Sequence, residues 1–337
     1  MNLKFIKKKN TLSFLVTHVP QESETIFPII NELNKAKKKI FVVFYRKELF
    51  DYYCKNKIFK IIKNQNNVKI LFLKNRIYKL IGSIYIFFKS DEIFLGDGIK
   101  NNYKTFFSKL NIFFRKEFFI FRHSTGTLIK NNHFLRFKEN VEFNKKLINL
   151  VSTEKCKEML ILNGYKKVFV IGEVYCDKNY LKLADNNTQK LRDYILLFSY
   201  KSNLSWFKYF DKVEHYKAIT QLLNKHYKKK TLIIKPHPSE NVSEIRKILM
   251  LLKFYNFKIV SENSISLAIN ASLVISLNTS AGLMSFKNKI PTVNLCFVTS
   301  AKKEERLKKF KNVSFLEGIP SVYNNQEFEI FLINLKN

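Results

Sequence analysis

The sequence predicts two α/β domains, each built on a doubly wound parallel sheet of the Rossmann type. Two observations lead to this class. Short apolar runs alternate with stretches whose apolar residues recur at helical spacing, and 337 residues suit two domains better than one. With 46% hydrophobic and 15% aromatic residues, the chain can fill two cores. We divide it into an N-terminal Rossmann-like domain, residues 1–185, and a C-terminal one, residues 186–337, facing each other across a cleft.

The first half of the chain alternates strands and helices. Apolar residues at helical spacing predict helices over 26–33, 47–63 and 76–89. Residues 104–122 interleave Phe with Lys, which favours a core helix with a lysine face, the alternative being a helix resting on lipid headgroups. The predicted strands are residues 11–16, 39–45, 68–73, 92–95 and 167–171.

A second series begins after the polar run 184–189, which we interpret as the linker. Its strands are predicted at 193–198, 231–234, 257–260, 273–276 and 291–295, and its helices at 212–226, 242–255, 264–270 and from 278 onward. In a parallel sheet the C-terminal ends of the strands lie along one edge. Polar groups that follow different strands should therefore converge at that edge.

The formal charge of +33 indicates an anionic partner, which can be nucleic acid, the surface of an anionic membrane or an acidic substrate. Compositional drift is the alternative, because the lysines are spread along the chain and Lys, Asn, Ile and Phe are all abundant, as an AT-rich genome would produce. No apolar run is long enough to span a bilayer, and Leu12–Val16 is too short for the core of a signal peptide. Four scattered cysteines favour a reducing cytoplasm.

The predicted strand 231–234 ends in Lys235-Pro-His237-Pro, which contains two of the six prolines of the chain. Each proline fixes its own φ and extends the residue before it. Lys235 and His237 are therefore held extended at the end of a strand, where α/β sheets present groups to ligands. A strand simply terminated by proline, with an exposed histidine, is the alternative.

Two further polar clusters follow strands in the second half. Asn278, Thr279 and Ser280 precede a predicted helix, whose first N–H groups attract an anion such as phosphate. The alternative is ordinary N-capping by these side chains. We expect the strand that carries Lys235 and His237 to be the neighbouring one, which favours phosphate. Glu262 follows the strand 257–260, and a carboxylate there suits the diol of a ribose, although it can equally be a solvated loop residue.

The first half contributes Gly96-Asp97-Gly98 at the end of a strand, in a chain with only eight glycines. Flanking glycines free the backbone and clear space for a ligand, so Asp97 can take a proton from an attacking hydroxyl. An ordinary Asp-Gly turn is the alternative. His18 follows the first strand and is a second candidate on the acceptor side. His215 and His226, on the predicted helix 212–226, are expected at the surface.

Several nucleotide and metal motifs are absent from the sequence. There is no GxxxxGK[ST] phosphate loop, no GxGxxG before a helix and no HExxH or paired Cys/His spacing. The sequence therefore predicts no P-loop, no dinucleotide fingerprint and no metal site.

An acid-Gly motif, a His-Pro motif and a Ser/Thr pair occur here in that order, as Asp97-Gly98, His237-Pro238 and Thr279-Ser280. This set resembles the signature of bacterial sialyltransferases, both the lipooligosaccharide sialyltransferases of glycosyltransferase family 52 and the bacterial polysialyltransferases. The resemblance spans residues 11–295 but rests on short motifs. It implies the GT-B type of α/β fold, with an acceptor-side N-terminal domain and a nucleotide-sugar-binding C-terminal domain. It also implies CMP-sialic acid as donor substrate, without a cofactor.

The resemblance implies a role for each matching residue. Asp97 is similar to the general base, and His237 to the histidine that hydrogen-bonds the CMP phosphate and assists its departure. Gly96 stands where the family has a first acid, which puts any role of that neighbour in doubt. The predicted site thus has Asp97 and His237 as catalytic residues and, as substrate-binding residues, Gly98, Lys235, Glu262, Asn278, Thr279 and Ser280.

The predicted function is metal-independent, inverting transfer of sialic acid from CMP-sialic acid to a cell-surface glycan, either lipooligosaccharide or capsule. The expected location is cytoplasmic, peripheral on the inner face of the bacterial inner membrane, with the anionic membrane surface as partner and no nucleic acid. One alternative is a GT-B transferase using CMP-Kdo or a UDP-sugar. An alternative of another class is a basic nucleic-acid-binding protein, against which the absence of known binding motifs argues. A structural role in capsule assembly without catalysis is the third alternative.

Overall fold

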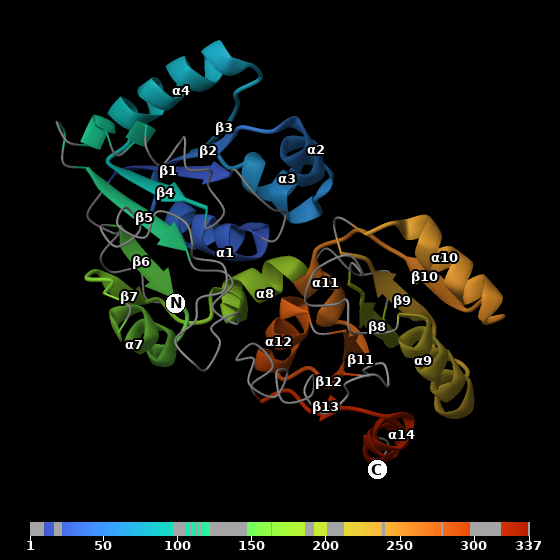
Figure 1. The fold of residues 1–337 in the computed structure, drawn as a ribbon. Helices are drawn as coiled ribbons and strands as arrows, with labels where there is room; N and C mark the ends of the chain where they lie inside the picture. Colours follow the sequence, from blue (N-terminus) through green and yellow to red (C-terminus); the bar gives the residue numbers. More distant parts are fainter. Residues whose placement is uncertain are drawn as a thin grey trace. The chain divides into compact units, whose positions relative to one another are not determined.

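The computed structural model describes residues 10–16, 22–96, 106–107, 109–111, 114, 116–121, 147–162, 164–185, 192–200, 212–237, 240–277, 279–296 and 318–335, with only the backbone at 22–25, 155 and 280. The chain divides into two units, Met1–Leu183 and Ala184–Asn337 (Figure 1). Each unit is an open parallel sheet with helices, so the predicted α/β class is confirmed. No helix in the described part of the chain is long and apolar enough to cross a membrane.

The N-terminal unit contains a seven-stranded sheet of order β3-β2-β1-β4-β5-β6-β7, in which every pairing is parallel. The chain first builds outward from β1 to β3 and then returns to place β4 on the other side of β1. The strand order therefore reverses between β1 and β4. The strands are β1 Thr11–Val16, β2 Lys39–Phe44, β3 Val68–Phe72, β4 Glu92–Leu95, β5 Glu117–Phe121, β6 Ile148–Val151 and β7 Val168–Val170.

The helices of this unit depart from the prediction at several places, and those at Glu154–Leu162 and Lys178–Asp185 were not predicted. The single helix expected over 47–63 is two helices, because Asn56 has an extended backbone and its side chain accepts hydrogen bonds from the N–H groups of Ile58 and Phe59. An asparagine that caps a helix start competes with continuing the helix before it. The elements are α1 Glu22–Lys35, α2 Lys47–Lys55, α3 Lys57–Lys63, α4 Arg76–Lys89, α7 Glu154–Leu162, the 3-10 turn η2 Val174–Cys176 and α8 Lys178–Asp185.

The predicted core helix over 104–122 is wrong at its C-terminal end, where Glu117–Phe121 forms strand β5. Four of its five residues are buried, as expected for a strand covered on both faces. Such a strand is apolar throughout and lacks the alternation of apolar and polar residues by which strands are recognised in a sequence. Phe121 joins a ladder of stacked rings across the sheet, with Phe94 at 5.3 Å, while Phe94 lies 4.6 Å from Phe14. The strand is therefore fixed by aromatic packing against its neighbours.

The C-terminal unit contains a six-stranded parallel sheet of order β10-β9-β8-β11-β12-β13. Here the order reverses between β8 and β11. Strand β13 has two residues, too few for any pattern to reveal, and neither it nor α14 was predicted. The elements are β8 Tyr194–Phe198, α9 Lys212–His226, β9 Leu232–Lys235, α10 Val242–Leu251, β10 Phe257–Ile259, α11 Ser264–Ala268, β11 Ala271–Ser276, α12 Ser280–Lys287, β12 Thr292–Leu295, β13 Ser321–Val322 and α14 Asn325–Asn334.

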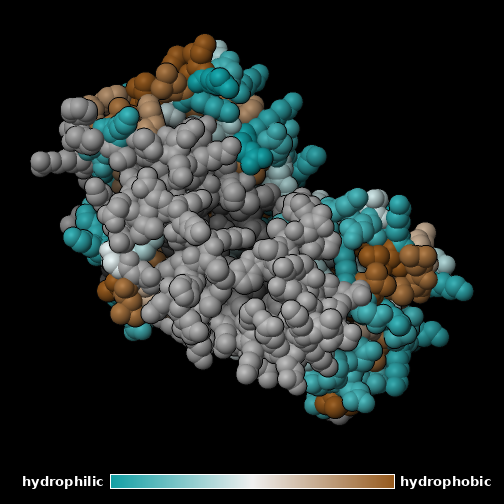
Figure 2. All heavy atoms as spheres, viewed as in Figure 1, coloured by the Kyte–Doolittle hydropathy of each residue, from teal (hydrophilic) through white to brown (hydrophobic). Residues whose placement is uncertain are grey.

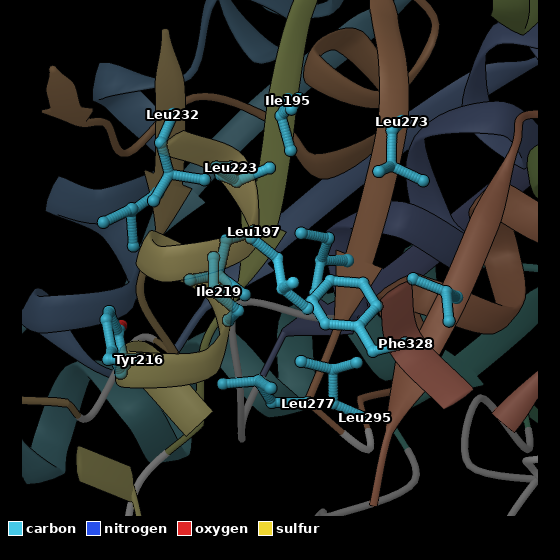
Figure 3. Packing of buried hydrophobic residues seen from close by; sticks show 14 of the residues in the cluster. Ile195, Leu197, Tyr216, Ile219, Leu223, Leu232, Leu273, Leu277, Leu295 and Phe328 are labelled. Carbon is cyan, nitrogen blue, oxygen red and sulfur yellow. The ribbon is translucent and has the colours of Figure 1, made fainter. Parts of the chain in front are cut away.

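Strand β8 sits at the centre of this core because its side chains alternate between two buried clusters. Ile195 and Leu197 join residues of α9, α10 and α14 on one face, whereas Leu196 joins α11 on the other. Figure 3 shows Leu197 and Phe328 within the first cluster. Helices on both faces of one sheet make the unit doubly wound.

Candidate functional site

The end of β9 is tied to the loop after β10. The Lys235 ammonium donates a 2.6 Å hydrogen bond to the backbone carbonyl of Glu262. The Glu262 carboxylate is half-buried and accepts from the N–H of Ser261 at 3.1 Å. Two of the predicted site residues, Lys235 and Glu262, are therefore brought together, because β9 and β10 are adjacent and parallel.

Glu240, which the sequence analysis missed, holds the loop that carries His237. Its carboxylate accepts a 3.0 Å hydrogen bond from the backbone N–H of His237, and its own N–H donates to the His237 carbonyl at 2.8 Å. These two bonds tie His237 to Glu240. The available signal was an acid three residues after the histidine, a spacing at which a carboxylate reaches back to a backbone N–H.

The same carboxylate is a hub for the loops around it. It accepts from the Ser199 hydroxyl at 2.7 Å and pairs with the Lys212 ammonium at 2.6 Å, and the Tyr216 hydroxyl donates to Ser199 at 3.0 Å. Glu240 and Lys212 are almost fully buried, with 1% and 5% of their side chains exposed. Burial raises the pKa of Glu240, while Lys212 and the hydrogen bonds oppose that rise. Burial likewise raises the pKa of Tyr216.

At the end of β11 the chain enters α12 through a hydroxyl pair. Thr279 occupies the N-cap position, yet its side chain makes no capping hydrogen bond. Its hydroxyl instead lies 3.2 Å from that of Ser276, which also accepts from the Thr279 N–H at 3.2 Å. The Thr279 hydroxyl therefore does not cap the helix, which was the alternative interpretation of this residue. The first N–H groups of a helix attract an anion. In α12, that of Gly282 already donates to the Thr279 carbonyl at 3.0 Å.

One expectation about this edge of the sheet is wrong. We expected the Lys235 and His237 strand to neighbour the strand before Thr279, but β8 lies between β9 and β11. Two strand spacings, roughly 10 Å, therefore separate them. Ser199, directly after β8, stands in the gap and connects to the His237 loop through Glu240. The reversal of strand order between β8 and β11 is also the position at which open α/β sheets bind ligands.

Four of the predicted site residues are not fully described by the structure. Asp97, Gly98 and Asn278 lie outside the described residues, and only the backbone of Ser280 is described. Strand β4 ends at Leu95, two residues before Asp97, and β1 and β4 are the strands between which the order of the first sheet reverses. His18, which follows β1, is also outside the described residues.

The expectation of surface positions for the two helix α9 histidines is wrong for His215, which is completely buried. Its Nδ1 lies 3.4 Å from the Tyr200 hydroxyl, and the two rings meet edge to face. Helix α9 turns this residue into the interior, where its ring packs against that of Tyr200. His226 is only partly exposed and lies 2.7 Å from the Glu329 carboxylate, which Lys225 also contacts.

Gly282 controls how closely α12 approaches β11. A Cβ at this position would lie 2.3 Å from Ser276 Oγ and 2.5 Å from Ser276 Cβ. Gly282→Ala is therefore expected to displace the start of α12 and to lower the free energy of unfolding by about 1–3 kcal/mol, the usual range for overpacking. Hydrogen exchange of the β11 and α12 amides measures the loss of stability, and nucleotide binding measures the displacement. Unchanged exchange together with unchanged binding would show that the contact is dispensable.

Two parallel α/β sheets of seven and six strands in one chain define the GT-B class of fold. Among solved structures, UDP-GlcNAc 2-epimerase from Methanocaldococcus jannaschii is 17% identical, with a TM-score of 0.61, covering 97% of this chain and 91% of that one. A complex of a M. jannaschii epimerase with UDP-GlcNAc and UDP is 15% identical (TM-score 0.56; 97% and 93% covered). A ugt transferase from Siraitia grosvenorii in complex with UDP is 10% identical (TM-score 0.54; 97% and 92% covered).

These identities are low, so the likeness establishes the fold and leaves the activity to be argued from residues. No protein-family model matches the sequence. No curated protein matches it either.

Proposed function

We propose that this protein is a glycosyltransferase acting on a nucleotide sugar, and that the donor is CMP-sialic acid. The observation that carries the proposal is the placement of Lys235, Glu262 and Thr279 at or just beyond the ends of β9, β10 and β11 of one sheet in a GT-B fold. Solved proteins of similar fold were crystallised with UDP or a UDP-sugar. The choice of CMP-sialic acid rests on the resemblance of the short motifs to bacterial sialyltransferases.

The donor phosphate is assigned to His237 and to the start of α12. The N–H groups of α12 and the Thr279 and Ser280 hydroxyls supply hydrogen-bond donors to an anion. Lys235 adds positive charge near the ribose, whose diol is assigned to Glu262. This assignment uses side chains and backbone groups alone.

The proposed reaction is a single displacement. An acceptor hydroxyl attacks the anomeric carbon of sialic acid while the bond from that carbon to the phosphate oxygen of CMP breaks, inverting the centre. Asp97 takes the proton of the attacking hydroxyl. His237 hydrogen-bonds the departing phosphate and supplies a proton to it. The products are CMP and a sialylated glycan, either lipooligosaccharide or capsule, made at the inner face of the bacterial inner membrane.

A UDP-sugar is the second candidate donor, because the similar structures include UDP complexes. A donor screen by thermal unfolding separates the two. A ligand at a hundred times its dissociation constant stabilises a protein by about 2.7 kcal/mol, which raises the melting temperature by several degrees. We expect this shift with CMP and CMP-sialic acid and none with UDP or UDP-GlcNAc. Transfer from CMP-sialic acid but not from CMP-Kdo separates the two CMP-sugars. Release of CMP in the presence of simple galactosides then measures transfer.

The control for this screen is a pair of variants in the C-terminal unit. His237→Ala should reduce the shift caused by CMP and lower turnover. Leu251→Ala changes a side chain on α10 that is 81% exposed, and it should leave both unchanged. Protection by UDP compounds alone would overturn the CMP assignment in favour of the second candidate. Salt-dependent binding of duplex DNA or single-stranded RNA, with no nucleotide-sugar protection, would favour the nucleic-acid alternative.

A further inference from the structure

Helix α4 displays an apolar face to solvent. It buries Ser83, Ile86 and Phe87 against the sheet, while its opposite side carries large apolar side chains that are 37–68% exposed. Figure 2 shows this brown strip beside hydrophilic residues at the top of the view. A surface helix normally has charged residues on that side. We call this set the α4 face; it consists of Ile77, Tyr78, Leu80, Ile81, Ile84, Tyr85 and Phe88.

The α4 face is held outward by specific contacts on the buried side. The Ser83 hydroxyl lies 2.8 Å from that of Tyr45, and Leu73 packs where Gly82 has no side chain. At the C-terminal end, Lys116 donates to the carbonyls of Phe87 and, at 2.6 Å, of Ser90. The helix cannot turn its apolar side inward without losing these contacts.

The patch continues beyond the helix. Phe114 is 48% exposed, and its ring meets that of Phe88 edge to face at 5.1 Å. Phe114 belongs to the Phe- and Lys-rich segment for which lipid contact was one interpretation. Among the described residues, seven exposed large apolar side chains lie on α4, and Phe114 is the one in that segment.

Positive charge surrounds the α4 face. Residues 52–90 contain nine Lys or Arg residues and no Asp or Glu. Lys74, Arg76 and Lys89 are exposed at the ends of α4, and Lys79 is half-buried on it. An apolar face flanked by cations is what a helix lying in the headgroup region of an anionic bilayer requires. Tyr78 and Tyr85 add amphipathic rings, which favour the same region.

We propose that the α4 face is a membrane-docking surface that inserts into the headgroup region of a bilayer containing anionic lipids. A second copy of this chain fits less well, because a symmetric contact would bring the same cations together in a protein of formal charge +33. A nucleic acid would use the cations but gain nothing from seven exposed apolar side chains. The proposal is independent of the nucleotide site.

Vesicle co-sedimentation of the full chain tests the proposal. The protein should bind vesicles containing about 30% phosphatidylglycerol and bind pure phosphatidylcholine weakly, since each cation near an anionic surface adds to affinity. The triple variant Ile77→Asn, Ile81→Asn and Phe88→Asn should bind the anionic vesicles at least about tenfold more weakly. The double variant Arg76→Glu and Lys89→Glu should lose the preference for anionic lipid.

The matched control removes an equal number of exposed apolar side chains elsewhere. Met250→Asn, Leu251→Asn and Tyr255→Asn change residues near the end of α10 that are 58–81% exposed, and they should leave vesicle binding unchanged. Unchanged binding by the α4 triple variant, or an equal loss in the control, would overturn the proposal. So would a dimer in solution that the α4 variant dissociates without any binding to vesicles. Donor protection against thermal unfolding, measured without lipid, should be normal in every variant, which separates this test from that of the proposed function.

Discussion

Replacing Glu240 with alanine is expected to lower the free energy of unfolding of the C-terminal unit by about 3–5 kcal/mol. The substitution leaves the ammonium of Lys212 buried without its closest carboxylate and removes the acceptor for Ser199 and for the His237 N–H. Hydrogen exchange of α9 and α10 amides is the measurement, because a chain of two units does not unfold in one step.

The control for Glu240 is Glu244, in the first turn of α10. Glu244 also approaches Lys212, at 3.5 Å, but its side chain is 44% exposed, so Glu244→Ala should cost under about 1 kcal/mol. The double variant Glu240→Leu and Lys212→Met removes both charges and should recover much of the stability. It should still bind CMP poorly, because the His237 loop has lost its acceptor. Equal effects of the Glu240 and Glu244 variants would contradict this account.

Asp97→Ala is expected to lower the rate of transfer by about 10²–10⁴-fold, the range for losing a general base. Binding of CMP should change little, because the base acts on the acceptor hydroxyl and makes no assigned contact with the donor. Single-turnover assays with CMP-sialic acid, together with CMP binding by calorimetry, separate the two. Asp97→Asn keeps the shape of the side chain without its basicity and should be equally slow. Full activity in either variant would remove Asp97 from the mechanism.

Much of the C-terminal unit was predictable because its short apolar strands alternate with amphipathic helices. The helix predicted over 212–226 matches α9 to the residue. The errors have local causes. Asn56 divides the predicted helix because it caps the start of α3. Glu117–Phe121 is a strand buried on both faces, so its residues show no alternation of apolar and polar side chains.

The candidate site was predictable as a set of strand ends but not as an arrangement. Lys235 and Glu262 meet as expected, since consecutive strands pair. The order of the strands in the sequence could not show that β8 lies between β9 and β11 in the sheet. After β10 the chain crosses to the other side of β8 to form β11, and only the folded sheet reveals that crossing. Glu240 was missed for a related reason: its partners Ser199 and Lys212 are remote in sequence, so only the folded chain reveals a hub there.

The contact of Lys116 with the end of α4 has a consequence for entry into lipid. The last carbonyls of a helix have no partners within it, and in hydrocarbon, where water is missing, each such group costs several kcal/mol. Lys116 already donates to the carbonyls of Phe87 and Ser90 in the folded protein. Burial lowers the pKa of this lysine, which is partly removed from solvent in the folded protein. In the proposed docking of α4, the two carbonyls would keep Lys116 as their hydrogen-bond donor, so loss of water there would leave them paired.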